Sequence, residues 1–377
     1  MIDIKDKSKC CGCAACAQRC PKQCITMLKD KEGFLYPKVD IVKCTDCGLC
    51  EKVCPVLNVS KARLPQKVYA AKNRDEEVRR QSSSGGVFTI FAEKIINAGG
   101  VVFGVRFNEN WEIVHSYTEN VEGLAAFRGS KYVQSVIGNS YKQAEAFLKQ
   151  GRDVLFSGTP CQIAGLKSFL RKEYDNLLTV ECVCHGVPSP LVWREYLKKI
   201  DPEIVNVNFR EKSRSWKKYN FVVNGRENTV NQLFYNNPYM QGFLRDIYLR
   251  PSCYACPAKS LKSGADITLG DFWGIDNYMP EIDDDRGVSL VMLHTEKGVS
   301  VFNAISCSKV EADYKRALAG NPSIERSARC NPKYRRMFWK SENRINEIPR
   351  IISKMKPSLI RKYVGYAKRI IKKIIFR

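Results

Sequence analysis

Several features that define membrane, secreted, hydrolytic or nucleotide-binding proteins are missing from this chain of 377 residues. No stretch approaches the roughly 20 apolar residues of a membrane span, and the first residues, MIDIKDKSK, contain no apolar signal region. Neither a G-x-G-x-x-G fingerprint nor a P-loop occurs. No Ser/His/Asp set or carboxylate pair stands in a context that indicates hydrolysis, and recognised nucleic-acid-binding motifs are absent. These absences favour a cytoplasmic protein with another kind of chemistry.

Cysteine is abundant, with 17 residues in the chain, and eight of them form two copies of one pattern. The pattern is C-x2-C-x2-C-x3-C-P, the bacterial ferredoxin run, in which the fourth cysteine ligates the other cluster. The spacing therefore predicts two [4Fe–4S] clusters. The first set is Cys10, Cys13, Cys16 and Cys54, and the second is Cys44, Cys47, Cys50 and Cys20.

Zinc sites and disulfides are less consistent with this arrangement of cysteines. Zinc sites with four thiolates usually show two separated C-x2-C pairs, not triplets with a trailing Cys-Pro. Disulfides require an oxidising compartment, whereas thiolate clusters require a reducing one, so the cytoplasm is again expected. Cys11 and Cys24 lie outside the pattern and are interpreted as small apolar fillers.

The chain is long enough for two or three domains. The hydrophobic pattern predicts an α+β ferredoxin-type domain over residues 1–60 with a hairpin at 25–28 and 34–37, and a polar linker at 58–67. An α/β domain is expected over 68–330 and a basic tail over 331–377. Within the α/β domain we expect strands at 101–105, 153–156, 177–183 and 289–293, and helices at 87–96, 141–150, 163–174 and 191–200.

Three loops of this second domain combine glycine with small hydroxyl side chains: 82–86, 129–132 and 157–160. Such loops expose backbone N–H groups at helix N-termini, where phosphates bind, and ligands collect at the carboxyl ends of parallel strands. Each loop alone is also compatible with an ordinary capped turn. Together they suggest a dinucleotide pocket, and FAD is the natural cofactor beside iron–sulfur clusters because it converts single-electron steps into two-electron chemistry.

Further cysteines occur in the second domain. Cys253 and Cys256 form a C-x2-C pair, whereas Cys161, Cys182 and Cys184 lie at loops that follow predicted strands. These cysteines could be scattered buried thiols, or four of them could complete a third metal site. The spacing alone does not decide between the two.

Several longer motifs occur in a fixed order between residues 84 and 274, including SGG, GSKYVQS, SGTPCQIAGL, CHGVPS, CYAC and GDFWG. In this order they resemble the coenzyme F420 hydrogenase/dehydrogenase beta-subunit family, here with a ferredoxin module at the N-terminus. The resemblance implies FAD and a third [4Fe–4S] cluster held by Cys161, Cys184, Cys253 and Cys256, with Cys182 as a spectator. The candidate FAD-binding residues are Ser84, Gly85, Gly86, Gly129, Ser130, Lys131, Tyr132, Gly158, Thr159, Pro160 and Gln162.

Two residues are candidates for a catalytic role. His185 could relay a proton to reduced flavin, although a histidine after a ligand cysteine often only orients its loop. Lys131 could stabilise the anionic reduced flavin or contact phosphate, or it could be a solvated lysine.

The leading hypothesis is a cytoplasmic iron–sulfur flavoenzyme that passes electrons between its clusters, FAD and a small two-electron acceptor or donor such as F420. The alternative is an electron-transfer subunit that serves a partner reductase. Either function requires a redox partner protein, a ferredoxin or a hydrogenase/dehydrogenase-type subunit.

The net charge of +23 favours acidic or anionic partners, and a nucleic-acid binder is a third, weaker hypothesis. Basic residues are concentrated near the C-terminus, where Ile370, Ile371, Ile374 and Ile375 share one helical face. This pattern suggests an amphipathic helix on an anionic membrane surface, hence a peripheral position at the inner membrane face. A protein-docking helix or a disordered tail fits the same pattern.

Overall fold

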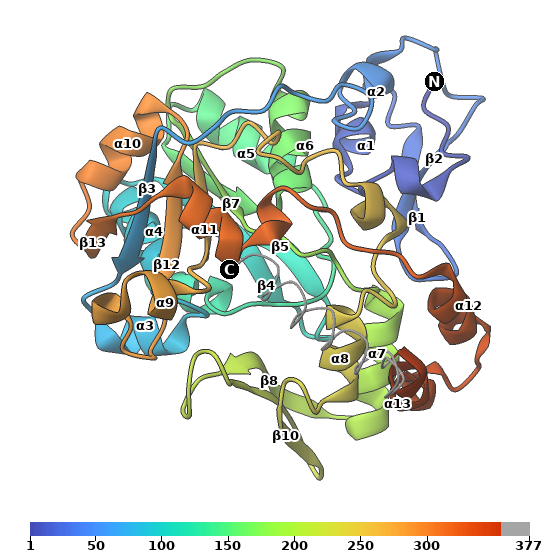
Figure 1. Cartoon of the computed structure of the whole chain (residues 1–377). Helices are drawn as coiled ribbons and strands as arrows, with labels where there is room; N and C mark the ends of the chain where they lie inside the picture. Colours follow the sequence, from blue (N-terminus) through green and yellow to red (C-terminus); the bar gives the residue numbers. More distant parts are fainter. Residues whose placement is uncertain (356–377) are drawn as a thin grey trace, which may run out of the picture.

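The structure, a computed structural model, describes residues 1–355. Figure 1 shows a small cysteine-rich unit at the N-terminus, in blue, lying beside a larger α/β body. The unit contains the hairpin β1 (Ile25–Lys29) and β2 (Leu35–Val39), in which Ile25 pairs with Val39. This hairpin was predicted from the two apolar segments around Asp30–Gly33. The unit also contains the short helices η1 (Lys7–Lys9), α1 (Ala15–Arg19) and α2 (Leu49–Lys52).

Each cysteine block has the same local architecture, a tight loop followed by a short helix. The helix α1 begins after Ala14, which has a φ of 59°, and α2 begins after Gly48, which has a φ of 68°. Left-handed backbone at these positions turns the loop sharply enough to place successive cysteines around one cavity. The repeated sequence pattern therefore folds into a repeated backbone pattern.

The body is built on an eight-stranded mixed sheet with the strand order β13-β3-β12-β11-β7-β6-β4-β5. The four strands β11, β7, β6 and β4 are parallel, and the other pairs are antiparallel. The bounds are β3 (Lys67–Lys72), β4 (Val101–Phe107), β5 (Ile113–Thr118), β6 (Val154–Gly158), β7 (Leu177–Cys182), β11 (Ile267–Asp271), β12 (Ser289–Leu293) and β13 (Ser308–Glu311). The α/β architecture and the four strands predicted from apolar runs are confirmed.

Helices cover both faces of this sheet. On one face α4 (Val87–Asn97) and α10 (Glu296–Asn303) pack through Phe91 and Phe302 onto Leu155 and Leu178. On the other face α5 (Ser140–Lys149) and α6 (Pro160–Leu170) pack onto Phe103 and Phe156. The cysteine-rich unit lies on the outer side of α5 and α6, since α1 contacts both helices. Helix α6 begins three residues earlier than the apolar pattern predicts, because Thr159 forms a capping box with Gln162.

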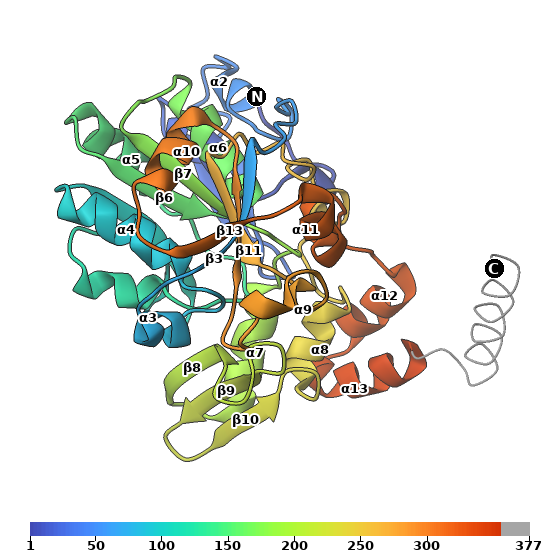
Figure 2. The same cartoon turned by 60° about the vertical axis from the view of Figure 1, so that its left-hand side comes forward.

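A second, smaller sheet follows α7 (Pro190–Ile200) and consists of β8 (Ile204–Glu211), β9 (Asn220–Gly225) and β10 (Thr229–Leu233). Figure 2 shows this sheet at the opposite end of the molecule from the cysteine-rich unit. The remaining elements are α3 (Glu76–Gln81), η2 (Glu122–Phe127), α8 (Pro238–Leu244), η3 (Pro251–Ala255), α9 (Ile275–Tyr278), η4 (Pro280–Ile282), α11 (Tyr314–Gly320) and η5 (Pro322–Ile324).

The described part of the basic C-terminal segment forms two helices, α12 (Pro332–Lys340) and α13 (Arg344–Met355). Helix α13 packs onto α7 and α8, and α12 packs onto α13. Phe338, Ile348 and Ile351 are buried in a shared apolar cluster. The four isoleucines predicted to face a membrane lie outside the described residues. Within residues 1–355, no helix combines the length and apolar character needed to cross a bilayer.

Candidate iron–sulfur and cofactor sites

The first predicted cysteine set surrounds one cavity, here called the inner cavity. It is lined by Cys10, Cys13, Cys16 and Cys54, together with Cys11 and apolar side chains. Cys13, Cys16 and Cys54 are buried. The four thiols that spacing assigned to one cluster are therefore brought together by the fold, although Cys54 is 38 residues or more from the other three in sequence.

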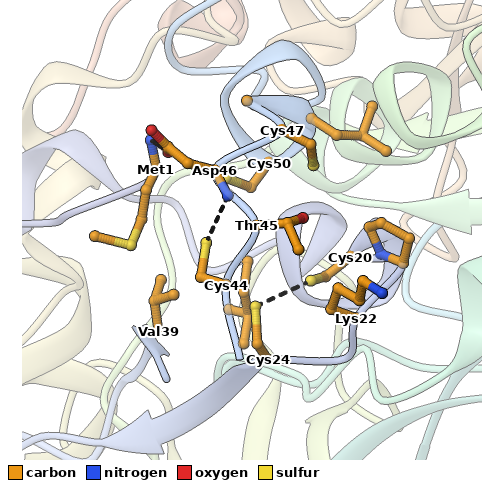
Figure 3. A pocket seen from close by; sticks show the side chains of 14 residues that line it. Met1, Cys20, Lys22, Cys24, Val39, Cys44, Thr45, Asp46, Cys47 and Cys50 are labelled. Carbon is orange, nitrogen blue, oxygen red and sulfur yellow. Dashed lines mark hydrogen bonds and ion pairs between the residues drawn. The ribbon is translucent and has the colours of Figure 1, made fainter. Parts of the chain in front are cut away.

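The second set surrounds a separate cavity, the outer cavity, which is lined by Cys20, Cys44, Cys47 and Cys50. Figure 3 shows this cavity with Cys24 next to Cys20, the two sulfur atoms being 3.4 Å apart. The backbone N–H of Asp46 donates to Cys44 Sγ at 3.4 Å, and that of Ile2 donates to Cys50 Sγ at 3.3 Å. Such donors stabilise thiolates, the form that ligates iron.

Both cavities fit a cluster. Among residues 1–355 all seventeen cysteines are free thiols, and no three His, Cys, Asp or Glu side chains close around a single ion. Each cavity is lined by four cysteine thiols, the donor set that a [4Fe–4S] cluster uses. Burial raises the pKa of Cys16 to about 12, so the lone thiol stays protonated, and bound iron would have to supply the positive charge that stabilises its thiolate.

The third set, Cys161, Cys184, Cys253 and Cys256, lies where α6, the loop after β7 and η3 meet. Burial raises the pKa of Cys253 to about 12 and that of Cys256 to about 11, and the nearby thiol of Cys161 adds to both rises. Burial likewise raises the pKa of Cys184, with further contributions from Cys182 and then Cys253. The four thiols therefore influence one another across a separation of up to 95 residues in sequence.

The loop after β7 lies directly against η3. The backbone N–H of Val187 donates to Cys253 Sγ at 3.4 Å, and Lys259 Nζ donates to the carbonyl of Cys184. Cys182 is exposed and lines the large cavity described below, as Cys184 also does. Cys182 lies close enough to Cys184 to raise its pKa, so its role as a spectator stays a prediction.

Helix α6 connects the inner cavity to the third cysteine set. Cys161 stands at the start of α6, and Gly165 one turn later faces Cys13, so that a Cβ at Gly165 would lie 2.7 Å from Cys13 Cβ. Cys11 is buried between the two sites. Hydrogen bonding to Cys13 is the largest cause that raises the pKa of Cys11, whereas hydrogen bonding to Cys161 lowers it. The two sites are therefore separated by side chains in direct contact and not by a solvent gap.

A cavity of about 520 Å³ opens at the carboxyl ends of β6, β7 and β11. Its size is in the range of sites for small molecules and cofactors. Nine of the eleven candidate FAD-binding residues line it, and they come from three loops that are up to 78 residues apart in sequence. These nine are Ser84, Gly86, Gly129, Ser130, Lys131, Tyr132, Gly158, Thr159 and Gln162.

The other two candidates lie behind the lining. Gly85 packs its backbone against β3 and β12, where a Cβ would lie 2.5 Å from the carbonyl oxygen of Ala71 and 2.7 Å from the nitrogen of Ser289. Pro160 is the first residue of α6 and preorganises that helix N-terminus. Both residues shape the loops, while their neighbours face the cavity.

Lys131 lines the cavity as predicted, and its environment is unusual. Its Nζ donates to the carbonyls of Arg128 at 2.9 Å and Gly129 at 3.3 Å. Burial lowers the pKa of Lys131 to about 7. An ammonium has three donors, so one N–H remains for a ligand in the cavity.

His185 also lines the cavity and is held by a carboxylate. Its Nε2 lies 2.6 Å from Asp246 Oδ1, and its ring packs edge-on against Phe243. Asp246 is itself fixed by the backbone N–H of Arg329, which donates to Oδ2 at 2.9 Å. With Nε2 bonded to Asp246, Nδ1 is the nitrogen left free to exchange a proton.

One polar residue of this cavity, Arg210, was not identified from the sequence. Arg210 on β8 is paired with Asp271 at the end of β11, and its guanidinium lies 4.5 Å from the centre of the Tyr219 ring. Within residues 1–355, Nε of Arg210 is buried without a hydrogen-bond partner. Asp271 belongs to the GDFWG motif, but nothing in the sequence pairs that motif with Arg210.

Glu181 is a second group that was not identified from the sequence. It lies on β7 at the cavity wall, and burial raises its pKa to about 7. Its Oε1 accepts a hydrogen bond from Thr268 Oγ1 at 2.7 Å, and Thr268 contacts His294 at 2.8 Å. Glu181 lies within a mainly apolar run, so its sequence context indicated only a buried strand.

Sequence profiles of known families match most of the described chain. Residues 9–58 match "4Fe-4S dicluster domain". Residues 68–140 match "Coenzyme F420 hydrogenase/dehydrogenase, beta subunit N-term", and residues 151–315 match the profile for the C-terminus of the same beta subunit. The two beta-subunit profiles together cover more than half of the chain.

Individual relatives agree with these matches. The chain is 27% identical to the F subunit of the F(420)H(2) dehydrogenase of Methanosarcina mazei, over 81% of this chain and 84% of that protein. It is 29% identical to the coenzyme F420-dependent sulfite reductase of Methanocaldococcus jannaschii, over 52% of this chain but only 30% of that longer protein.

A chain of the F420-reducing [NiFe] hydrogenase complex from Methanosarcina barkeri aligns at 15% identity with a TM-score of 0.46, over 74% of this chain and 93% of that one.

The profile matches, with the ordered cysteine sets and cavity loops, lead to one conclusion: this chain is an iron–sulfur protein of the coenzyme F420 hydrogenase/dehydrogenase beta-subunit family.

Proposed function

We propose that the protein carries three [4Fe–4S] clusters and one FAD, and that it transfers electrons between a redox partner protein and a small two-electron acceptor or donor. F420 is the first compound to test, because two relatives are named for it. The two ferredoxin-type clusters would occupy the inner and outer cavities, the third would be held by Cys161, Cys184, Cys253 and Cys256, and FAD would occupy the large cavity.

One observation carries this proposal: the segment Cys184–His185 takes part in both sites. Cys184 belongs to the third cysteine set and also lines the large cavity. A cluster held by that set would therefore adjoin a ligand in the cavity. The inner cavity in turn adjoins the third set through Cys11 and α6. The sites form a continuous series from the outer cavity to the large cavity.

FAD, when bound, supplies the exchange between single electrons and two-electron or hydride chemistry. The protein supplies binding and charge. The capped N-terminus of α6 and the loop at Gly129–Lys131 present backbone N–H groups and a cation, which suit phosphates or an anionic isoalloxazine. Ser83 and Ser130, whose hydroxyl oxygens are 2.7 Å apart, join two of the three loops.

Two further groups would act on the small-molecule partner. His185, oriented by Asp246, can hold or release a proton at Nδ1 beside the cavity. Arg210, paired with Asp271, lines the same cavity and would place a positive charge there. The cavity reaches the surface, because the side chains of Cys182 and Leu244 at its wall are exposed. An open cavity favours an enzyme with its own substrate over a subunit that only relays electrons.

Counting cofactors tests the proposal. Anaerobically reconstituted protein should contain about twelve irons, as three cubanes require, and one FAD. The Cys256→Ser variant should lose about four irons and keep the two N-terminal clusters. Cys330→Ser changes an exposed cysteine outside the set and should keep the full content. Eight irons in fully reconstituted wild-type protein would remove the third cluster.

The flavin site has its own test. Ser130→Trp should fill the cavity and abolish FAD binding, whereas Ser130→Ala removes the hydroxyl without filling space and should retain FAD. Stoichiometric FAD in the tryptophan variant would place the flavin elsewhere. Reduction of F420 by the wild-type protein with dithionite as donor would then distinguish an enzyme from a relay, which should react only through a partner subunit.

A further inference from the structure

Arg250 is one of the largest fully buried side chains of the protein and lies where the cysteine-rich unit meets the body. Its Nε donates to the carbonyl of Cys10 at 2.7 Å, and its Nη2 donates to the carbonyl of Leu35 at 2.9 Å. Nη1 donates to Gln134 Oε1 at 2.9 Å. The guanidinium also lies 4.3 Å from the centre of the Tyr36 ring.

All of these partners are electrically neutral. In the part of the chain that the structure describes, Arg250 forms no ion pair with a carboxylate. Arg335 at the same junction is different, since it pairs with Glu32. An arginine remains protonated in proteins, and burying a charge without a counter-charge is unfavourable. A negative charge close to Arg250 would therefore stabilise this arrangement.

Cysteine thiolates of the cluster sites can provide that charge. Nη2 of Arg250 lies 3.6 Å from Cys10 Sγ, a ligand in the inner cavity. The positive charge of Arg250 also acts on the third set. Burial raises the pKa of Cys253, and the charge of Arg250 opposes that rise. Arg250 also immediately precedes η3, which carries Cys253 and leads into Cys256, and the Cys253 N–H donates to the Arg250 carbonyl at 2.9 Å.

The residues around Arg250 leave space for its guanidinium and hold it in place. A Cβ at Gly12 would lie 2.7 Å from Arg250 Nη1, so only glycine leaves room at this position of the first cysteine loop. Gln134 contacts both sides, because its Nε2 donates to the Cys11 carbonyl at 3.0 Å while its Oε1 accepts from Arg250. The guanidinium is therefore held at the first cysteine loop from both the unit and the body.

We propose that Arg250 is a positioning residue that sets the reduction potential of the inner cluster, with the cluster's negative charge as its missing counter-ion. The inference rests on the proposed inner cluster. A cluster becomes more negative on reduction, so a buried cation 3.6 Å from one ligand sulfur stabilises the reduced form and raises the potential. The outer cavity has no such buried cation among the described residues that line it. With Arg250 present, the inner cluster is thereby a better acceptor for electrons from the outer one than it would be without it.

The test is an EPR-monitored redox titration of the holoprotein. Arg250→Gln should lower the potential of the inner cluster by about 59 mV or more, which is a tenfold change in the equilibrium constant of a one-electron couple. Arg250→Lys keeps the charge and should lie closer to wild type. Arg335→Gln removes a junction arginine that already has a carboxylate partner and should leave the potential unchanged. Cys47→Ser identifies the outer-cluster signal by altering it.

A second variant covers the case in which Arg250→Gln fails to assemble. Gln134→Glu keeps Arg250 and places a carboxylate against its Nη1, which should neutralise the cation and also lower the potential. Iron content distinguishes a failure of the proposed function from a failure of the proposed role of Arg250. A wild-type protein without an inner cluster would contradict the proposed function, whereas variants with full iron and wild-type potentials would overturn the role of Arg250 alone.

Discussion

The inner and outer cavities arise from the same sequence pattern but differ in their surroundings. Three of the four cysteines of the inner set are buried, and the cavity lies against α6 of the body. None of the four cysteines of the outer set is buried, and Cys47 is exposed. The ion pairs near the outer cavity, between the N-terminal amine and Asp46 or Glu51, are also exposed and therefore weak.

Under the proposed function, this difference suits the two similar sites to different roles. A cluster near the surface can exchange electrons with a docked protein, whereas a cluster buried against the body can exchange them with the next site inside. Solvent exposure and nearby charge both tune cluster potentials. A duplicated motif can therefore provide an entry site and an internal site because the rest of the chain packs against only one copy.

The largest effect is expected from removing one ligand of each set. Cys16→Ser should abolish the inner cluster and strongly lower the thermal stability of the junction, because metal binding contributes folding free energy and Cys16 is buried. Cys47→Ser should affect only the outer cluster. Iron analysis and calorimetry of both variants decide the matter, and equal losses of stability would argue that the two sites are equivalent.

A smaller effect is expected at the contact between α6 and the inner cavity. In Gly165→Ala the new methyl group would lie 2.7 Å from Cys13 Cβ and 2.9 Å from Tyr141 Oη, so the cysteine loop must shift. Overpacking of this kind costs about 1–3 kcal/mol, and the inner cluster signal should change while the outer one persists. Ser168→Ala on the same helix is the matched control. Unchanged spectra and stability in Gly165→Ala would show that the junction is loose.

Chelation kinetics sharpen the comparison further. Iron should leave the outer site on the order of tenfold faster than the inner one. This ratio requires that local opening of the outer site costs only ~1.4 kcal/mol less free energy than local opening of the inner site. The measurement is the loss of each EPR signal with time in the presence of a chelator. Loss of both signals at one rate would mean that the unit opens as a whole.

The smallest effect concerns the large cavity and its pH dependence. Burial lowers the pKa of Lys131 to about 7, so its ammonium is present below that pH and is lost above it. If FAD binding needs the ammonium, affinity should fall by at most ~tenfold per pH unit above pH 7. Lys131→Arg, which stays charged, should show a flat profile, and a flat wild-type profile between about pH 6 and 9 would exclude this role.

The same shift has a consequence for stability. Between about pH 7 and the ordinary lysine pKa, the unfolded chain binds more protons at Lys131 than the folded protein does. The contribution of this residue to stability therefore increases as the pH rises through that window. Lys131→Met should remove this increase in the apoprotein.

Local patterns in the sequence were sufficient for several parts of this protein. The two cysteine runs predicted which thiols share a cavity, because the exchange of the fourth cysteine follows from the chain geometry of such a repeat. Apolar runs predicted β4, β6, β7 and β12, since buried strands require them. Glycine and hydroxyl loops predicted most of the large cavity, because left-handed turns and helix caps depend on residue type.

Other features were decided only by tertiary packing. Nothing local pairs Arg210 with Asp271, places Asp246 against His185, or brings Arg250 to the Cys10 loop, because each pair is separated by 61 or more residues in sequence. The unequal burial of the two cysteine sets likewise has no local signal. The sequence by itself determined which groups can ligate iron, while the packing of α6 and η3 against one cysteine loop decided which site faces the interior.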